Sequence, residues 1–353
     1  MTIHTNHTQS LLSVAKWAFT TRRVNPADAV GMSQDFSNAK AGDLVLCQIL
    51  QIGQHKNIQL SNRRTSASYP GDYVVLCLGD RYAPDQFLCR AEISNAPMQL
   101  AAGGGIVGTV EASHQKMKTP TSVQPIGVLK NADGKTLNVG DYAQAPLAPN
   151  NDITVIGVFG ASMNSGKTTA AVSLAHGLKN AGYNVAGSKA TGTGAFGDFH
   201  AFEDAGINVT DFTDAGMATT YKMPMSRIEA GFETLVATAA SKGAEVAVVE
   251  IADGVFQQET KKILKASRIR DRLDGILFAA PDALSAYGGV TLLEGYGLSP
   301  FAISGMVSLS PLATAEAAEV TGLPILTREH LWDPNVVQNT MGQLMRNPEL
   351  VAA

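Results

Sequence analysis

The chain has 353 residues, of which 45% are apolar and 16% charged, and its net charge is −4. This length predicts two or three domains, and the composition is that of a folded globular protein rather than a disordered or fibrous one. The small negative charge and the lack of a prominent Lys/Arg cluster argue against nucleic acid as a partner.

The sequence contains no apolar run long enough to span a bilayer, and residues 1–10 lack the basic and apolar regions of a secretory signal peptide. We therefore expect a cytoplasmic protein with no membrane partner. The three cysteines, Cys47, Cys77 and Cys89, are widely spaced and form no C-x-x-C pair. This spacing argues against a disulfide framework or a zinc knuckle, and it is typical of reduced thiols.

Residues 1–38 are an N-terminal arm, in which residues 11–19 predict a short helix with its apolar positions on one side. A helix of this kind packs on a neighbouring domain or subunit, and we expect a homo-oligomer. Residues 39–147 contain short predicted strands, at 42–49, 58–60 and 73–78, with turn residues between them. This pattern indicates a small, mainly antiparallel β barrel or sandwich.

The stretch at residues 79–87 is denser in polar and aromatic side chains than a plain hairpin needs. It suits a recognition loop, because loops carry binding residues disproportionately. The more common outcome is a buried ion pair between Arg81 and an aspartate beside a turn.

Residues 148–353 form the third predicted domain, which follows a linker rich in Pro, Ala and Asn at 143–152. Residues 153–182 give a strand, a small-residue loop and a helix, which is the order of a phosphate-binding P-loop. In such a loop the backbone N–H groups point at phosphate oxygens, so large side chains are absent near them. Lys167 would reach the β- and γ-phosphates, and the Thr168 hydroxyl would bind Mg²⁺. The expected nucleotide-binding residues are Ser162, Met163, Asn164, Ser165, Gly166, Lys167, Thr168 and Thr169.

The rest of this domain alternates apolar strands with helices. Strands are predicted at 184–187, 245–251, 274–280, 302–307 and 323–326, and a helix at 225–241. Strands that are apolar along their whole length indicate a parallel sheet covered on both faces by helices. The predicted fold class is therefore α/β, a P-loop parallel sheet preceded by the small β domain.

Ligands of such sheets lie beyond the carboxyl ends of the strands, where this chain has several polar residues. Glu250 ends an apolar strand, where an acid either binds Mg²⁺ or is bound by a helix N-terminus. Asp211 is either a further metal ligand or a helix cap. Lys189 ends another strand, where it would hold an anionic substrate or stabilise charge during group transfer; the alternative is a solvated surface lysine. The remaining expected substrate contacts are Thr191, Asp214 and Asp253.

Three segments resemble dethiobiotin synthetase and its relatives: the loop SGKTT, the lysine in SKATGTG, and the acid that closes VAVVE. The resemblance covers about residues 153 to 330, and the same region is similar to the uncharacterised P-loop family numbered 1611 among domains of unknown function. It implies a ligase or synthetase that uses ATP and Mg²⁺ to activate a small carboxylate, carbamate or amino-acid-like substrate by phosphoryl transfer. It also implies that Lys167 and Lys189 are catalytic and that Thr168 and Glu250 bind the metal.

The chain departs from that family at the turn 251–254, at the turn 189–192, and in having the extra β domain. Two other functions therefore stay open. One is a group transferase with a phosphate-bearing donor such as an acyl-coenzyme A, and the other is a nucleotide-regulated NTPase that binds a protein partner. No N-K-x-D segment for guanine is present, and the equivalent residues 307–311 contain no carboxylate, so the sequence favours ATP over GTP.

Overall fold

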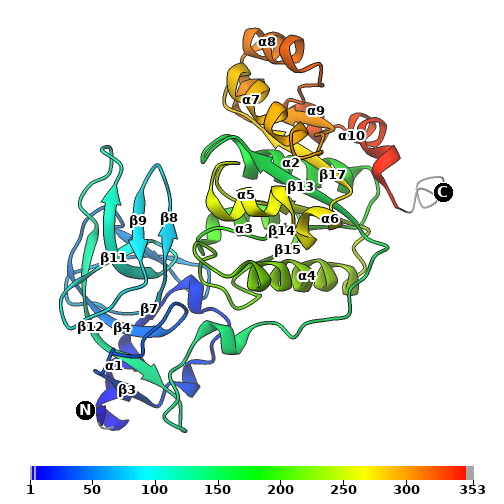
Figure 1. The fold of residues 1–353 in the computed structure, drawn as a ribbon. Helices are drawn as coiled ribbons and strands as arrows, with labels where there is room; N and C mark the ends of the chain where they lie inside the picture. The colour runs from blue at the N-terminus through cyan, green and yellow to red at the C-terminus, as the bar shows by residue number, and fades with distance from the viewer. Residues whose placement is uncertain (1, 4, 347–353) are drawn as a thin grey trace. The chain divides into compact units, whose positions relative to one another are not determined.

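The structure, a computed structural model, describes residues 2–3 and 5–346 and divides into two compact units (Figure 1). The first unit contains the described residues up to Gln144, together with Thr193–Phe196 and Phe212–Met223. The second unit contains Ala145–Gly192, Gly197–Asp211 and the described residues from Pro224 onward. Two short segments from the middle of the sequence therefore belong to the first unit.

A ten-stranded, mainly antiparallel sheet makes up the first unit, and β4, β7, β11, β10 and β12 pair in a closed ring. The prediction of a mainly antiparallel β domain is confirmed. The strands are β1 (Thr2–Ile3), β2 (Lys16–Trp17), β3 (Gly31–Ser33), β4 (Leu44–Gln51), β7 (Tyr73–Leu78), β8 (Arg81–Tyr82), β9 (Phe87–Arg90), β10 (Met98–Ala102), β11 (Ile106–Ser113) and β12 (Thr121–Lys130), with β5 (Asn57–Gln59) and β6 (Thr65–Ala67) as a separate pair.

Strand β4 is apolar along most of its length because both of its faces are buried. Leu44 and Leu46 contribute to one apolar cluster, which also contains Leu12 of the N-terminal segment. Val45 and Cys47, which point to the other face, contribute to a second cluster. The N-terminal segment therefore helps to cover one face of this sheet.

The predicted helix at 11–19 is wrong in its bounds. Helix α1 spans Thr5–Val14, and the next residues form β2, which runs parallel to β7 with Trp17 opposite Val75. The Lys16 ammonium binds Asp72 Oδ2 at 2.5 Å and the Ala67 carbonyl at 2.8 Å. Pairing with a distant strand decides the conformation here, where the local apolar pattern favours a helix.

Arg81, in the polar stretch at 79–87, is buried and binds neighbouring groups of the first unit. Its guanidinium donates to the Ala101 carbonyl and, at 2.9 Å, to Gln86 Oε1. These bonds join the hairpin of β8 and β9 to β10, which gives the arginine a structural role.

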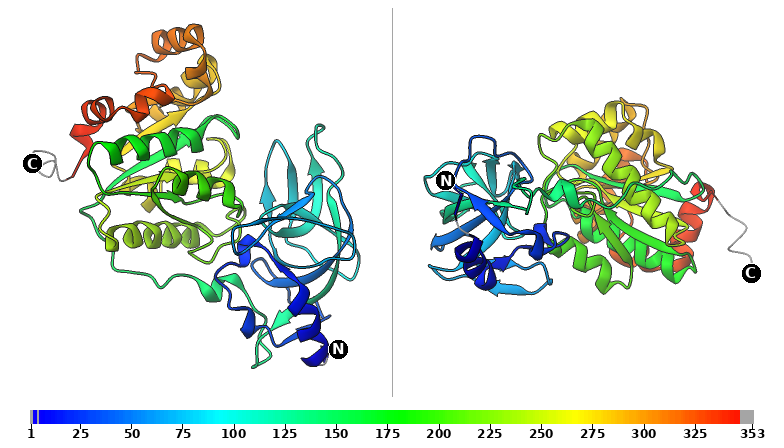
Figure 2. Two further views of the ribbon diagram at one scale, coloured as in Figure 1. Left: turned by 180° about the vertical axis from the view of Figure 1, so that it is seen from behind. Right: turned by 90° about the horizontal axis from the view of Figure 1, so that it is seen from below.

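A six-stranded parallel sheet, in the order β15-β14-β16-β13-β17-β18, forms the centre of the second unit. Helices cover both of its faces. Helices α4 and α5 lie on the face that is turned to the viewer in Figure 1, and α2, α9 and α10 lie on the opposite face, which Figure 2 (left) shows. The predicted α/β class is confirmed. The strands are β13 (Thr154–Gly160), β14 (Val185–Lys189), β15 (Asn208–Asp211), β16 (Val246–Glu250), β17 (Gly275–Ala279) and β18 (Ala302–Ser304). The helices are α2 (Lys167–Asn180), α3 (Phe196–Asp204), α4 (Met225–Ser241), α5 (Gln258–Lys265), α6 (Arg268–Arg272), α7 (Ala283–Glu294), α8 (Pro311–Thr321), α9 (Arg328–Trp332) and α10 (Pro334–Met341).

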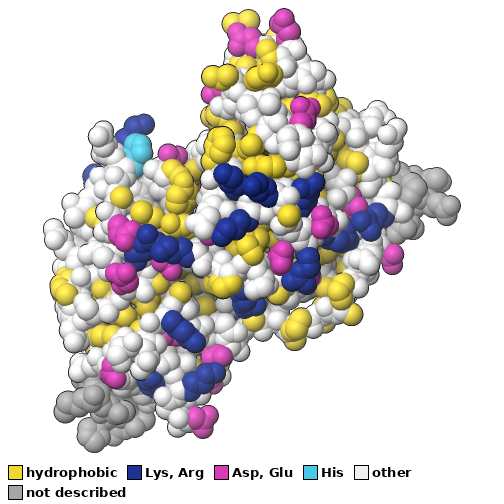
Figure 3. Space-filling model, viewed as in Figure 1, with side chains coloured by type: hydrophobic (Ala, Val, Ile, Leu, Met, Phe, Trp, Pro, Cys, Tyr) yellow, Lys and Arg dark blue, Asp and Glu magenta, His cyan; other side chains and the backbone are white. Residues whose placement is uncertain are grey.

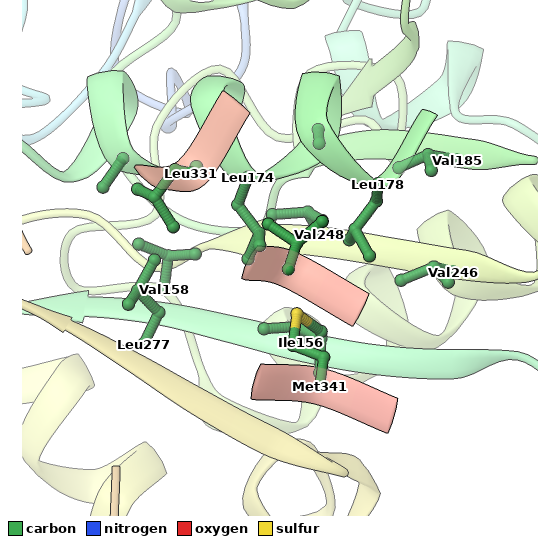
Figure 4. Close-up of a cluster of buried hydrophobic side chains, with 14 of the residues drawn as sticks. Ile156, Val158, Leu174, Leu178, Val185, Val246, Val248, Leu277, Leu331 and Met341 are labelled. Carbon is green, nitrogen blue, oxygen red and sulfur yellow. The ribbon is translucent and has the colours of Figure 1, made fainter. Parts of the chain in front are cut away.

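Helix α2 packs on the central strands and holds the start of the candidate site in place (Figure 4). Ile156 and Val248 of the strands and Leu174 of α2 belong to one cluster of buried apolar side chains. Leu331 of α9 and Met341 of α10 belong to the same cluster. The long sequence separation of these helices explains why local periodicity does not predict their contact.

The predicted strand at 323–326 is wrong. Only one parallel bridge forms there, between Ile303 and Ile325. Pro324 has no N–H to donate, and Thr327 already caps α9. The segment is therefore too short and too poor in donors to extend the sheet.

Basic side chains gather over α5 and α6 on the surface (Figure 3). Arg268 pairs with Glu229 and Glu233, whereas Lys261 and Lys262 are exposed. The expectation that no Lys/Arg cluster stands out is wrong for this surface, and the absence of a nucleic-acid partner stays a prediction.

Within the described residues, no helix is both long and apolar enough to cross a lipid bilayer.

The contact between α2 and α9 leaves no room for a side chain at Gly177, because a Cβ atom there would lie 2.0 Å from the Leu331 carbonyl oxygen. We predict that Gly177→Ala lowers the free energy of unfolding by about 1–3 kcal/mol, measured by urea denaturation. Gly288→Ala in α7 is the matched control, since no atom lies within 4 Å of its added Cβ. It should raise the free energy of unfolding by about 0.5–1 kcal/mol. A Gly177→Ala variant as stable as the parent would contradict this packing.

Candidate functional site

The loop between β13 and α2 is a tight turn that leaves no room for a side chain at its two glycines, Gly160 and Gly166. A Cβ on Gly160 would lie 2.3 Å from Ser165 Oγ, and a Cβ on Gly166 would lie 2.8 Å from Gly305 Cα. Gly166 has a φ of +97° and Asn164 a φ of +61°, in the left-handed region. The chain therefore turns sharply between β13 and α2, as it does in a loop that cradles phosphate oxygens.

Turns that follow β16 and β18 hold this loop. After β16, the Val255 N–H donates to the Gly160 carbonyl at 3.1 Å. After β18, the Met306 N–H donates to the Ser165 carbonyl at 3.1 Å. Gly254 presses against the loop as well, since a Cβ there would lie 2.4 Å from the Ala161 carbonyl oxygen. The shape of the loop is thus fixed from both sides.

Two side chains of the loop are suited to an anionic ligand. Lys167 is 6% exposed, and its ammonium donates to the Ser162 carbonyl at 2.8 Å. Burial lowers the pKa of Lys167 below its ordinary value, although Glu250 acts in the opposite direction. The buried Ser165 hydroxyl has no hydrogen-bond partner among the described residues. Buried donors of this kind are normally satisfied, so they fit the phosphate groups of a nucleotide.

Next to the loop, four side chains form a polar cluster. The Thr168 hydroxyl lies 3.0 Å from Glu250 Oε2 and 3.1 Å from Asp198 Oδ1. The Lys189 ammonium binds Asp198 Oδ2 and lies 3.2 Å from Glu250 Oε1. Lys189 and Glu250 are directly opposite in the parallel pairing of β14 and β16. The register of the sheet therefore brings the predicted lysine and the predicted acid together.

The charges in this cluster stabilise one another. Burial acts to lower the pKa of Lys189, but the attraction of Glu250 and Asp198 outweighs it and raises the pKa above its ordinary value. Burial likewise acts to raise the pKa of Asp198, but Lys189 outweighs it and lowers that pKa. Lys189 and Asp198 are therefore both ionised at neutral pH.

The same cluster contains the oxygen ligands that Mg²⁺ prefers. Thr168, Glu250 and Asp198 supply one hydroxyl and two carboxylates at the N-terminus of α2. No group of three or more His, Cys, Asp or Glu side chains that could hold a metal ion occurs within residues 2–3 and 5–346. Mg²⁺ in nucleotide sites commonly uses one or two carboxylates together with phosphate and water, so these residues fit it.

The other predicted site residues have different surroundings. Asp211 ends β15 and lies opposite Lys189, with β14 between it and the strand of Glu250. Thr191 accepts a hydrogen bond from the Ala252 N–H at 2.8 Å and so joins two turns at the end of the sheet. Asp253 has a φ of +62°, and its charge acts on Lys167. The roles of these residues in metal or substrate binding stay predictions.

Asp214 belongs to the first unit rather than to the P-loop unit. Its carboxylate lies 2.8 Å from the Arg22 guanidinium and 3.9 Å from that of Arg23. The structure thus brings Lys167, Thr168, Lys189 and Glu250 together and gives Asp214 a partner of its own.

Asp198 is the member of the cluster that sequence reasoning missed. It lies in the first turn of α3, where an acid is common simply because it complements the helix dipole. The available signal was its position shortly after the turn that carries Lys189. That signal does not distinguish a site residue from an ordinary first-turn acid.

Comparisons with known proteins add little to this geometry. Neither a protein-family model nor a curated protein matches the chain. The signal recognition particle receptor FtsY from Elizabethkingia anophelis, in complex with GDP, aligns over 57% of this chain and 67% of its own, with 17% identity and a TM-score of 0.38. The signal recognition particle 54 kDa protein from Aeropyrum pernix K1, in complex with GDP, aligns over 58% of this chain and 50% of its own, with 23% identity and a TM-score of 0.36. The P-loop fold of the second unit is therefore assigned from its own strand, loop and helix.

Removing Lys189 would leave two carboxylates close together without their buried counter-charge. We predict that Lys189→Met lowers the free energy of unfolding by about 3 kcal/mol at neutral pH. The difference in the free energy of unfolding between the parent and Lys189→Met should become smaller below about pH 5, for two reasons. First, the carboxylates of the variant take up protons, which removes their repulsion. Second, the lowered pKa of Asp198 stabilises the folded parent at pH values above the ordinary carboxyl pKa, and the parent loses this stabilisation as the pH falls.

Urea denaturation in the presence of a metal chelator measures this gap across the pH range. Lys242→Met, at an exposed lysine that follows α4, is the control and should give no such pH dependence. A gap that stays constant as the pH falls would show that Lys189 does not neutralise the cluster.

Proposed function

We propose that the second unit is an ATP- and Mg²⁺-dependent enzyme that activates a small carboxylate or carbamate by phosphoryl transfer, as a ligase or synthetase does. The observation that carries the proposal is the Lys189 ammonium, bound between Asp198 and Glu250 beside the Thr168 hydroxyl. Its side chain is only 15% exposed. A buried cation next to a phosphate loop is suited to an anion that reacts there.

Each part of the chain has a distinct role in this proposal. The N–H groups of the loop and the Lys167 ammonium would bind the phosphates of the nucleotide. Thr168, Glu250 and Asp198 would hold Mg²⁺. When bound, the nucleotide supplies the phosphoryl group and Mg²⁺ neutralises phosphate charge. The protein contributes mainly positioning and electrostatic stabilisation.

Lys189 would bind the acceptor anion. Its ammonium binds the two carboxylates that would also hold the metal, so Asp198 and Glu250 would hold Lys189 less strongly in the metal-bound protein. A lysine released in this way, still largely buried, is strongly attracted to an anionic substrate. This competition links acceptor binding to metal binding.

The choice of adenine is supported by the residues after β18. Ser308 donates to the Gly305 carbonyl at 2.8 Å, and Ser310 caps α8. The segment 307–311 offers no carboxylate that could bind the guanine edge. The base is nevertheless best tested directly, with ATP and GTP side by side.

We predict that Lys167→Ala abolishes nucleotide-dependent turnover and weakens nucleotide binding, because it removes the cation of the phosphate loop. Lys189→Ala should keep ATP binding within about threefold of the parent and lose product formation, because it removes the acceptor contact. Calorimetric titration with ATP and GTP measures binding, and phosphate release in the presence of candidate carboxylates measures turnover. Full turnover in either variant would refute the assignment.

Lys242→Ala is the matched control for these variants, since this lysine is exposed and lies at the end of α4. Phosphate release in equal amounts with product supports phosphoryl transfer. Product formation without any consumption of ATP would instead indicate a transferase with a phosphate-bearing donor.

One observation favours a second candidate, a nucleotide-regulated NTPase that binds a protein partner. The first unit includes two segments from the middle of the sequence, Thr193–Phe196 and Phe212–Met223. Residues Gly197–Asp211, which include Asp198, lie between these two segments in the sequence. A movement of Asp198 on nucleotide binding would therefore be passed along the chain to both segments. Slow hydrolysis that increases only when a protein partner is added, with no effect of any carboxylate, would favour this candidate.

A further inference from the structure

A cavity of about 400 Å³ lies within the second unit, between α2, α3 and α9. This volume is in the range of sites for small organic molecules. Thr168 and Thr169 at the N-terminus of α2 line it, and so does His176, two turns further along the helix. Since an α-helix rises about 1.5 Å per residue, the lining extends about 12 Å along α2 from Thr168.

One wall of the cavity is apolar, and small residues make the space. Ala201 and Ala205, which are four residues apart, face Val172 of α2. Trp332 of α9 supplies the largest apolar surface, and its side chain remains partly exposed. A ligand that enters this space can therefore bury an aliphatic or aromatic body.

Two opposite charges line the same cavity, Arg328 on α9 and Asp204 on α3. In the described part of the chain, neither side chain has a hydrogen bond or an ion pair. The Arg328 guanidinium stacks over the Trp332 ring, 4.4 Å from its centroid. Stacking occupies the face of the guanidinium and leaves the N–H groups on its edge available for a carboxylate. Asp204 disfavours an anion on the α3 side and so directs it to Arg328.

We propose that this cavity binds the non-reacting end of an organic acid, with an anionic group on Arg328 and an apolar body against Trp332, Val172 and the two alanines. In one respect the inference rests on the proposed function: the reacting end would lie beyond Thr168, whose hydroxyl contacts the carboxylates that bind Lys189. The substrate class is then an acid that carries a second anionic group on an apolar spacer. Binding of the anionic end itself does not depend on the nucleotide.

Octanoate is the probe for this end, and octanamide is its uncharged match. The chain has two tryptophans, so Trp17→Phe leaves Trp332 as the fluorescent reporter. In that background we expect octanoate to change the emission saturably, with a Kd about fivefold lower than that of octanamide. Arg328→Ala should abolish the difference between the two probes, and Asp204→Asn should strengthen octanoate binding. Lys265→Ala, at an exposed lysine of α5, should change neither.

Three results would overturn the inference: no saturable change, equal affinity for the two probes, or an unchanged preference in Arg328→Ala. A leucine at Ala205 gives a separate check, because it fills the cavity and should weaken both probes at least tenfold. If Ala205→Leu does not fold, Arg328→Ala and Asp204→Asn still decide the question.

Lys167→Ala separates this inference from the proposed function. It should weaken nucleotide binding and leave octanoate binding unchanged. If the parent binds octanoate with these preferences and binds no nucleotide, the proposed function fails while the cavity assignment stands. If the parent binds and turns over ATP without any binding of octanoate, the cavity assignment alone fails.

Discussion

The ion pairs of Lys189 with Asp198 and Glu250 are the interaction on which the candidate site depends. Glu250 is 2% exposed, and a carboxylate at that depth is costly unless a cation neutralises it. Parallel pairing of β14 and β16 places Lys189 opposite it. Asp198 then makes the second pair and connects the cluster to α3. The fold therefore places one ammonium group against two carboxylates at the carboxyl end of the sheet.

The phosphate loop owes its shape to neighbours that are distant in the sequence. The turns at Gly254 and Gly305 approach it so closely that neither position has space for a side chain. Because the two turns end different strands, formation of the sheet also forms the loop. A loop fixed in this way loses little conformational entropy when a ligand binds, which is the physical basis of preorganisation.

The sequence predicts this site where the signals are local. The strand, loop and helix around Lys167 follow from the local sequence pattern of residues 153–182, and Glu250 follows from its place at the end of an apolar strand. Asp198 could not be predicted, because a first-turn acid has an ordinary structural explanation. At residues 11–19 and 323–326 the local apolar pattern gives the wrong secondary structure. Pairing of β2 with the distant β7 decides the first segment, and the lack of backbone donors decides the second. The closed ring of strands in the first unit likewise depends on long-range pairing that periodicity does not encode.

The assignment of Thr193–Phe196 and Phe212–Met223 to the first unit limits how the chain can be divided. Within that unit, Thr193 forms a bridge with Thr219, and Ala218 belongs to an apolar cluster with strand residues of the β sheet. A single cut after Gln144 would strip these residues of their neighbours and present apolar surface to water. The two units are thus interleaved along the sequence, and neither can be excised as one uninterrupted stretch with its own packing intact.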